Sequence, residues 1–234
     1  MWDEIFKLSE VYYDSNLGIY RSKFLIDLES KNIWDKHWSK KSSLNTLFER
    51  FARFYRRTFI SRVVSKYCDK YFKERGVYLE AGSGTADSSF RIPKRKRVFI
   101  ACDISVFPLL RIENKNIDIK LQADIFKLPL VDESIDGIYN IGVMEHFTFD
   151  ENVRILHEFE RVLKPRGVIV LFWPWKYCWV EIVSKLKPLF PPSPSMFGTF
   201  DFNELISTTE LLKVWEGLSI LDGFIHKIVV MTKL

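Results

Sequence analysis

The sequence predicts an α/β fold: a doubly wound, seven-stranded, mostly parallel sheet with an antiparallel last strand, preceded by a helical N-terminal extension. Two observations support this prediction. From residue 77 onward, short apolar runs alternate with helical patterns, which is typical of a parallel sheet covered on both faces. The first apolar run ends in an acidic residue and a glycine-rich turn, as strands that form a ligand-binding sheet edge do. With 234 residues, 47% of them hydrophobic, the chain is long enough and apolar enough to form the core of one such domain.

We expect residues 1–75 to form a helical extension or lid, and residues 76–234 to form the core, with an aromatic insert at about 173–200. Up to about residue 43 the pattern indicates short helical pieces rich in Trp and Tyr. Over residues 44–75, apolar residues recur at three- and four-residue steps, which predicts a long helix that Gly76 ends.

The core begins with five predicted strands, at residues 77–81, 98–103, 119–123, 137–141 and 167–172. Between the fourth and fifth strands, an apolar stripe over residues 151–163 predicts a crossover helix that the Lys164–Gly167 turn stops. Another helix is expected over about 203–215. Two closely spaced β-like runs, 218–225 and 227–232, predict an antiparallel pair at the sheet edge.

Composition narrows the function classes. Cys68, Cys102 and Cys178 form no C-x-x-C pair, so the sequence predicts a reducing compartment and no metal site. The N-terminus lacks a signal-peptide pattern, and charges and a proline interrupt the most apolar stretch, so we expect a cytoplasmic protein with no transmembrane segment. A net charge of +5 is too small an excess to indicate nucleic-acid binding by itself.

The glycine-rich turn follows the first strand as Glu80-Ala81-Gly82-Ser83-Gly84. Gly82 and Gly84 permit tight backbone angles and close approach of a ligand to the main chain. A helix N-terminus is expected beyond them. Glu80 disfavours a phosphate but accepts hydrogen bonds from a cationic group or a ribose hydroxyl, so the turn indicates a nucleoside-like ligand that carries positive charge.

Two further acids end the next two strands. Asp103 lies 23 positions after Glu80, where a carboxylate commonly holds ribose hydroxyls; a helix cap is the alternative. Asp124 precedes Ile125, so its carboxylate can accept from an adenine amino group while Ile125 covers the ring; a turn cap is the alternative. All three acids are expected to gather at the carboxyl edge of the sheet.

These elements, together with Asp136-Gly137 and the Leu163-Lys164-Pro165-Arg166-Gly167 turn, resemble the class I S-adenosylmethionine-dependent methyltransferases, which have a Rossmann-like fold. The resemblance covers about residues 75–175. It implies S-adenosylmethionine as cofactor. The implied cofactor-binding residues are Gly82, Ser83 and Gly84 for the methionine part, Asp103 at both ribose hydroxyls, Asp124 and Ile125 at the adenine, and the backbone of Asn140 and Ile141 at the amino-acid group. Glu80 and Ile104 are further cofactor-binding residues that the resemblance implies.

The chain departs from this pattern at Ala86, where many members of the family have glycine. Alanine is small enough to be compatible with the expected helix start. A nicotinamide dinucleotide is disfavoured, because its fingerprint needs glycine at the position of Asp87.

Beyond the cofactor residues, His146 follows the fourth strand and is a candidate base that takes a proton from the acceptor; a capped turn before the next helix is the alternative. Trp34, Trp38, Trp173 and Trp175 lie outside the common core and are candidates to wall an apolar or aromatic acceptor, or else to pack within a lid.

The leading hypothesis is methyl transfer to a small-molecule acceptor. Arginines on the 44–75 helix and the basic run 91–97 keep two alternatives open: an RNA methyltransferase, or a non-catalytic module that uses a basic face to hold RNA or another partner. An anionic membrane surface is a further partner for such a face. The sequence does not identify the acceptor atom or the oligomeric state.

Overall fold

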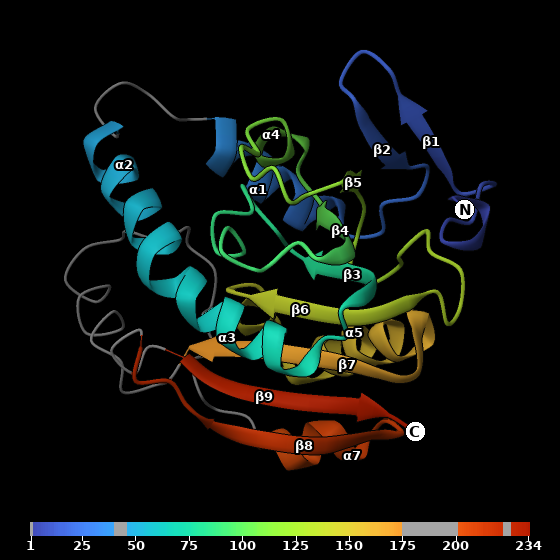
Figure 1. The fold of residues 1–234 in the computed structure, drawn as a ribbon. Helices are drawn as coiled ribbons and strands as arrows, with labels where there is room; N and C mark the ends of the chain where they lie inside the picture. Colours follow the sequence, from blue (N-terminus) through green and yellow to red (C-terminus); the bar gives the residue numbers. More distant parts are fainter. Residues whose placement is uncertain (1, 40–45, 175–200, 222–225) are drawn as a thin grey trace.

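A computed structural model shows the chain folded around one nine-stranded sheet (Figure 1). The structure describes residues 2–39, 46–174, 201–221 and 226–234. The strands are β1 (Val11–Asp14), β2 (Ile19–Ser22), β3 (Arg75–Ala81), β4 (Lys96–Asp103), β5 (Ile119–Gln122), β6 (Ile135–Ile141), β7 (Leu163–Pro174), β8 (Leu211–Leu218) and β9 (His226–Lys233). The helices are α1 (Leu28–Ser39), α2 (Thr46–Tyr55), α3 (Ser61–Tyr71), α4 (Val106–Leu109), α5 (Phe149–Val162) and α7 (Phe202–Ser207), with short turns η1 (Trp2–Glu4) and η4 (Met144–His146) and a π-helical segment η3 (Arg56–Ile60).

The strand order is β1-β2-β5-β4-β3-β6-β7-β9-β8. Strands β5, β4, β3, β6 and β7 are parallel to one another, and β9 is antiparallel to both β7 and β8. The chain moves outward from β3 through β4 to β5 and then returns to the other side of β3 as β6. This reversal creates a switch point at the carboxyl ends of β3 and β6, where sheets of this kind bind ligands. The predicted α/β fold with an antiparallel strand near its end is confirmed.

The sheet has two strands more than predicted, because residues 11–22 form a hairpin instead of short helices. Strand β2 pairs with β5, so the N-terminal region extends the sheet. The hairpin turn has the chemistry that such a turn needs: Asp14 accepts from the N–H groups of Asn16 and Leu17, and Gly18 adopts a φ of +66°. The expected short helical pieces are therefore wrong over residues 11–22, where Asp14, Asn16 and Gly18 supply a hairpin turn.

The predicted helix over 203–215 is also wrong in its second half. Helix α7 ends at Ser207, and residues from Leu211 onward form β8, which pairs with β9. Strand β9 pairs with β7 on one edge and with β8 on the other, so its backbone groups have hydrogen-bond partners along both edges. This pairing overrides the local helical pattern of the residues that form β8.

Two apolar cores lie on opposite faces of the sheet. Alternate residues of β3 separate between them: Leu79 contributes to the core under α5, while Tyr78 contributes to the core under α3. Helix α5 begins at a capping box in which Thr148 and Glu151 satisfy each other's backbone N–H groups. Figure 1 shows α3 in front of the sheet and α5 behind it.

The predicted long helix is present as α2, η3 and α3, which follow one another without a break from Thr46 to Tyr71. Val64 and Cys68 of α3 are buried against the sheet. The helical rod ends only a few residues before β3, so its C-terminal end lies at the amino edge of the sheet and its N-terminal end extends toward the carboxyl edge (Figure 1).

The basic run 91–97, which the sequence offers as part of a basic face, is largely paired within the protein. Arg97 belongs to β4 and is almost completely buried. Its guanidinium donates to the carboxylate of Asp69 at 2.9 Å and to the carbonyls of Lys73 and Phe72, both at 2.7 Å. Arg95 pairs with Asp69 and Glu74. This run therefore fastens the end of α3 to the sheet and offers little free charge.

None of the helices in the described ranges is both long and apolar enough to cross a membrane.

Replacing Arg97 by Ala is expected to destabilise the fold by about 3–5 kcal/mol, because the partly buried carboxylate of Asp69 and the carbonyls of Lys73 and Phe72 lose a fully buried donor. Arg95→Ala is the matched control: its side chain is 37% exposed, so the loss should stay within about 1 kcal/mol. Urea unfolding followed by circular dichroism measures both. Equal losses for the two variants would contradict the anchoring role of Arg97.

Candidate active site at the carboxyl edge of the sheet

The structure brings the glycine turn, Asp103, Asp124 and Asn140 together at the carboxyl ends of neighbouring strands. The turn after β3 needs glycine for two reasons. Gly82 and Gly84 have φ values of +72° and +51°. A Cβ on Gly82 would also lie 2.2 Å from Cγ2 of Val143, in the loop after β6, which is closer than any real contact.

Asp103 ties the ends of β3 and β4 together. Its Oδ2 accepts from the N–H of Gly84 at 2.9 Å, and its Oδ1 accepts from the N–H of Ser105 at 2.9 Å. Burial raises the pKa of Asp103 to about 6, although these two hydrogen bonds favour the charged form. Each oxygen retains a lone pair that can accept from a ligand hydroxyl. The helix-cap alternative is also realised in part, since Ser105 precedes the short helix α4.

Glu80 points elsewhere. Its Oε2 accepts from the hydroxyls of Ser89 at 2.7 Å and Tyr139 at 3.2 Å, in the core under α3. Burial raises the pKa of Glu80 to about 8. Glu80 therefore supports the glycine turn from behind, and the structure shows no direct approach from Glu80 to the open edge.

The expected helix after the glycine turn does not form. Residues 82–92 wind as successive turns, and Ala86 adopts a φ of +51° with its side chain fully buried. A residue in the left-handed region cannot continue into a right-handed helix, so the expected helix start at Ala86 was wrong.

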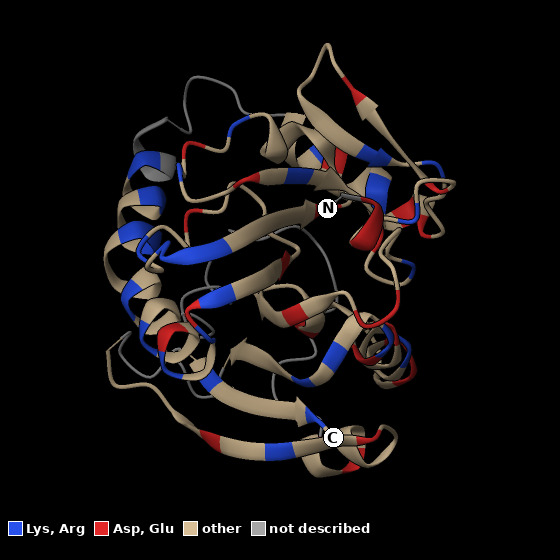
Figure 2. Cartoon of the chain, turned by 45° about the vertical axis from the view of Figure 1, so that its right-hand side comes forward, with Lys and Arg blue, Asp and Glu red and all other residues tan. Residues whose placement is uncertain are grey.

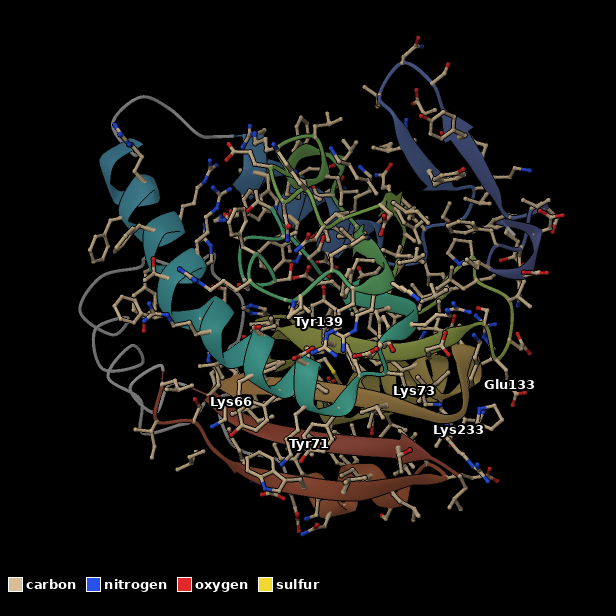
Figure 3. All side chains as sticks on the ribbon, viewed as in Figure 1. Lys66, Tyr71, Lys73, Glu133, Tyr139 and Lys233 are labelled. Carbon is tan, nitrogen blue, oxygen red and sulfur yellow. The ribbon has the colours of Figure 1, made fainter. Side chains whose placement is uncertain are left out.

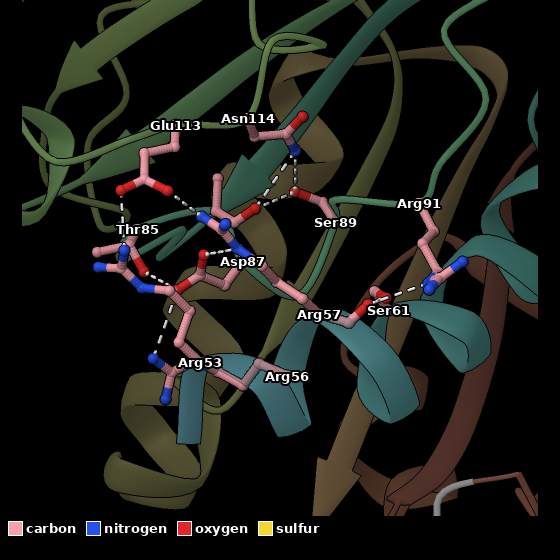
Figure 4. A network of polar contacts seen from close by, with 11 residues as sticks. Arg53, Arg56, Arg57, Ser61, Thr85, Asp87, Ser89, Arg91, Glu113 and Asn114 are labelled. Atoms are coloured by element: carbon pink, nitrogen blue, oxygen red, sulfur yellow. Dashed lines mark hydrogen bonds and ion pairs between the residues drawn. The ribbon is translucent and has the colours of Figure 1, made fainter. Parts of the chain in front are cut away.

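A cluster of arginines from α2 and η3 holds this turn through Asp87 (Figure 4). The Asp87 carboxylate is buried and lies 2.7 Å from Arg57, 3.4 Å from Arg56 and 3.7 Å from Arg53. Arg53 and Arg57 also pair with Glu113 at 2.8 Å. These arginines, predicted as part of a basic outer face, point inward, and the two carboxylates balance two of their three positive charges.

Asp124 and Ile125 do not have the arrangement that the resemblance implied. Oδ2 of Asp124 accepts from the N–H groups of Ile26 at 3.0 Å and Asp27 at 2.7 Å, and Oδ1 accepts from Phe126 at 3.0 Å. Ile125 packs in the core under α5, with 7% of its surface exposed. Asp124 thus anchors the segment that leads into α1. It caps a local turn through Phe126, as the turn-cap alternative predicts, and it also binds backbone N–H groups of a segment far away in the sequence.

Helix α1 lies across the carboxyl edge. Asp27 caps its first turn by accepting from the N–H of Ser30. Farther along the helix, the hydroxyl of Ser105 donates to Asp35 at 2.6 Å, and a ring carbon of Trp38 lies 3.3 Å from where a Cβ on Gly84 would stand. The sequence does not predict the hydrogen bond between Ser105 and Asp35, because nothing in the local sequence of either residue marks it as a partner of the other.

The turn that carries His146 lies next to α1. Asn140 donates to the carbonyl of Ala81 at 2.7 Å, which fixes the end of β6 to that of β3. Asn152 of α5 donates to the carbonyls of Met144 and Phe147 and so holds the η4 turn between them. The ring centroids of His146 and Trp34 are 5.4 Å apart, in an edge-to-face contact.

Burial lowers the pKa of His146 to about 4, so the ring is neutral near pH 7. Its Nδ1 atom is buried and has no hydrogen-bond partner among the residues that the structure describes. A buried ring nitrogen without a partner is a position that a ligand can complete. The neighbouring carboxyl of Glu145 is also buried, which raises its pKa to about 7.

The remaining predicted site residues fall into three groups. Ile104 and Ile141 are half-buried beside Asp103 and Asn140. Trp173 is 2% exposed and packs edge-to-face on Phe202 at 5.2 Å, so it is a core residue and not a wall of the acceptor site. Trp175 and most of the aromatic insert lie outside the described residues. Among the described residues, no group of three or more His, Cys, Asp or Glu side chains could hold a metal ion.

Comparisons with known proteins agree with this geometry. Residues 79–171 match the family of the methyltransferase domain. An uncharacterized methyltransferase-like protein of Schizosaccharomyces pombe is 29% identical over 138 residues, which cover 56% of this chain and 52% of the relative. The tRNA (carboxymethyluridine(34)-5-O)-methyltransferase of Arabidopsis thaliana is 32% identical over 115 residues, which cover 48% of this chain and 28% of that enzyme.

Among solved structures, the 1,6-didemethyltoxoflavin-N1-methyltransferase of Burkholderia thailandensis, with bound 1,6-didemethyltoxoflavin and S-adenosylhomocysteine, is similar with a TM-score of 0.61. The match has 13% identity and covers 96% of this chain and 99% of that one. At this identity the likeness concerns the fold. The aligned region spans only about half the length of the fission-yeast relatives, at 52% and 57%.

Asp124→Ala is expected to loosen α1, because the N–H groups of Ile26 and Asp27 lose their acceptor. Amide hydrogen exchange over residues 26–39 should accelerate, and stability should fall by about 1–3 kcal/mol. Asp201→Ala is the matched control, since Asp201 caps α7 through the N–H of Asn203 and should leave exchange in α1 unchanged. Unaltered exchange in α1 of the Asp124 variant would contradict its anchoring role.

Proposed function

Because residues 79–171 form a class I S-adenosylmethionine-dependent methyltransferase domain, we propose that the protein transfers a methyl group from this cofactor to a small-molecule acceptor. The observation that carries the acceptor part of the proposal is the buried, unpartnered Nδ1 of His146 beside the ring of Trp34. A ring nitrogen and an aromatic wall suit an acceptor with an apolar or aromatic body and one O–H or N–H group.

The residues at the carboxyl edge fit the proposed cofactor in most respects. The free lone pairs of Asp103 match two ribose hydroxyls, and the glycine turn lets the methionine part approach the main chain. The backbone at Asn140 and Ile141 borders the same turn. Ile104, half-buried beside Asp103, replaces Ile125 as the proposed apolar contact for the adenine ring, since Ile125 belongs to the core.

The cofactor supplies a positively charged sulfonium whose methyl group a nucleophile displaces directly. The protein's own part is to position and deprotonate the nucleophile. We assign to neutral His146 the acceptance of the acceptor's proton at Nδ1, with Trp34 holding the acceptor body. Helix α1 contacts the glycine turn through Trp38, so admitting the cofactor requires that α1 shifts outward; α1 then acts as the lid expected for the N-terminal region.

RNA is the second candidate acceptor, and the observation that favours it is the similarity to the plant tRNA methyltransferase. The internal pairing of Arg53, Arg57, Arg95 and Arg97 weighs against it, because these cations are not free to contact phosphates. A third candidate is a non-catalytic module that binds the cofactor without transferring its methyl group. The irregular turn at Ala86 motivates it.

One experiment separates the three candidates. The protein is incubated with methyl-labelled S-adenosylmethionine and separated RNA, lipid and small-metabolite fractions. Label in metabolites or lipids supports a small-molecule acceptor, and label in RNA supports the second candidate. Cofactor binding with no label in any fraction supports the non-catalytic module.

Calorimetry with S-adenosylhomocysteine tests the cofactor site directly. The wild type should bind, and Asp103→Ala should bind about 1–3 kcal/mol more weakly because the ribose hydrogen bonds are lost. Asp201→Ala, at an exposed cap far along the chain, should bind like the wild type. A folded wild-type protein that does not bind would overturn the proposed function.

His146→Asn should lower kcat by roughly 10²–10⁴-fold while affinity for S-adenosylhomocysteine stays unchanged, because the residue meets the acceptor and not the cofactor. Since burial favours the neutral ring and sets the pKa of His146 at about 4, wild-type activity should persist well below pH 6.5 before protonation removes the base. His157→Asn, on an exposed face of α5, is the control. An unchanged kcat at saturating acceptor would exclude His146 as the base.

A further inference from the structure

Helix α2 presents two large apolar side chains, Phe51 and Phe54, to the outside. Arg53 of α2 and Arg57 of η3 turn toward the body, where they pair with Asp87 and Glu113, while Arg50 of α2 is exposed. The side chains of Phe51 and Phe54 are 64% and 59% exposed. A surface helix of a globular protein normally has the opposite orientation, with its apolar stripe toward the core. The exposed phenylalanines of α2 therefore require an explanation outside the fold.

The exposed stripe continues along α3 as a row of cations. Arg62, Lys66 and Lys70 follow one another at four-residue steps, so they lie one above the other on the exposed side of the helix. Lys73 extends the row just beyond α3, and Figure 3 shows Lys66 and Lys73 on this front face. Figure 2 shows the basic residues distributed along the same helical rod.

These cations are not neutralised by the protein. Within the described part of the chain, Arg62, Lys66 and Lys70 form no ion pair with a carboxylate. The two acids nearest to the row in sequence are engaged elsewhere: Asp69 pairs with Arg95 and Arg97, and Glu74 pairs with Arg95. The row therefore presents uncompensated positive charge to its surroundings.

The aromatic and cationic halves form one continuous surface. Phe51, Tyr55 and Phe59 are also spaced by four residues, and the rings of Tyr55 and Phe59 are in contact at 5.3 Å. Arg62 follows Phe59 by three residues, so the stripe passes from η3 into α3 on the same side. At 1.5 Å per residue, the rod from Thr46 to Tyr71 is roughly 35–40 Å long.

We propose that this stripe, defined as Phe51, Phe54, Phe59, Arg62, Lys66 and Lys70, docks the protein on an anionic membrane surface. A helix that lies in the membrane plane buries aromatic side chains at the boundary between headgroups and acyl chains, while its cations meet lipid phosphates. The stripe offers both kinds of contact along one helical rod. This inference concerns where the protein binds and does not depend on methyl transfer.

The position of the charges favours a lipid surface over RNA. The cations of the stripe lie on α3, toward the amino edge of the sheet, while Phe51 and Phe54 lie on α2, near the turn that carries Asp87. An RNA that reaches the candidate active site would need free cations at the carboxyl edge, where Arg53 and Arg57 are already paired with carboxylates. A membrane surface needs only that aromatic and cationic side chains face the same way.

Vesicle flotation tests the proposal with the full chain. Phosphatidylcholine vesicles are compared with vesicles that contain about one-third phosphatidylserine, at about 0.05 M and about 0.5 M salt. The wild type should float with the anionic vesicles at low salt and much less with the zwitterionic ones. The triple variant Arg62→Gln, Lys66→Gln, Lys70→Gln should bind roughly a hundredfold more weakly, from about 1 kcal/mol per cation. The double variant Phe51→Ser, Phe54→Ser should lose at least roughly tenfold.

Two control variants test whether the location of the residues on the stripe matters, and not only the number of charges or apolar groups removed. The variant Lys96→Gln, Lys115→Gln, Arg166→Gln removes the same net charge from exposed sites elsewhere, and Leu212→Ser, Val214→Ser removes exposed apolar groups from β8. Both should float like the wild type. Thermal melting and calorimetry with S-adenosylhomocysteine establish that every variant is folded, and they report on the cofactor site independently of the membrane.

Failure of the wild type to bind anionic vesicles at low salt overturns the proposal. Equal losses for the stripe variants and their matched controls overturn it as well. The same holds if the stripe residues prove necessary for retention of RNA in a gel-shift assay while vesicle binding is absent.

Discussion

The buried carboxylate of Asp87 is the constraint on which the arrangement of this protein depends. A carboxylate so deeply buried is costly unless cations and hydrogen bonds surround it, and here three arginines and the hydroxyl of Thr85 do so. The arginines all come from α2 and η3, so Asp87 fixes which side of that helix faces the protein. The glycine turn next to Asp87 is held at the same time, because its conformation determines where the carboxylate lies.

Two features of the molecule follow from this cluster. The turn after β3 is stabilised by side chains from an earlier helix, so it does not need a helix of its own, and Ala86 can occupy a left-handed conformation. In addition, Phe51 and Phe54 of α2 face outward, since Arg53 of the same helix is committed to Asp87 and Glu113. The candidate active site and the proposed membrane-binding stripe are thus two consequences of one set of ion pairs.

The sequence predicted those parts that local patterns specify. The apolar runs of β3, β4 and β6 and the capped helix α5 were found because each has a clear period and a clear stop signal. Asp103 was placed correctly because it ends a strand. The anchoring of α1 by Asp124 and the packing of Trp173 depend on contacts between residues that lie 98 and 29 positions apart in the sequence. No local pattern encodes such contacts. The hairpin at Gly18 does have a local turn signal, but a glycine between two short segments is equally compatible with a break between helices.

The electrostatics of the carboxyl edge support a cationic ligand more strongly than the motif does. Asp103 and Glu145 are buried, and burial raises their pKa values to about 6 and about 7. Neither of them forms an ion pair within the described residues. Carboxyl groups in this state favour their charged forms when a positive charge approaches, because the attraction offsets part of the cost of burial. A neutral or anionic ligand gives no such gain. The sulfonium of S-adenosylmethionine brings positive charge to this edge, so the raised pKa values and the proposed cofactor are physically consistent with each other.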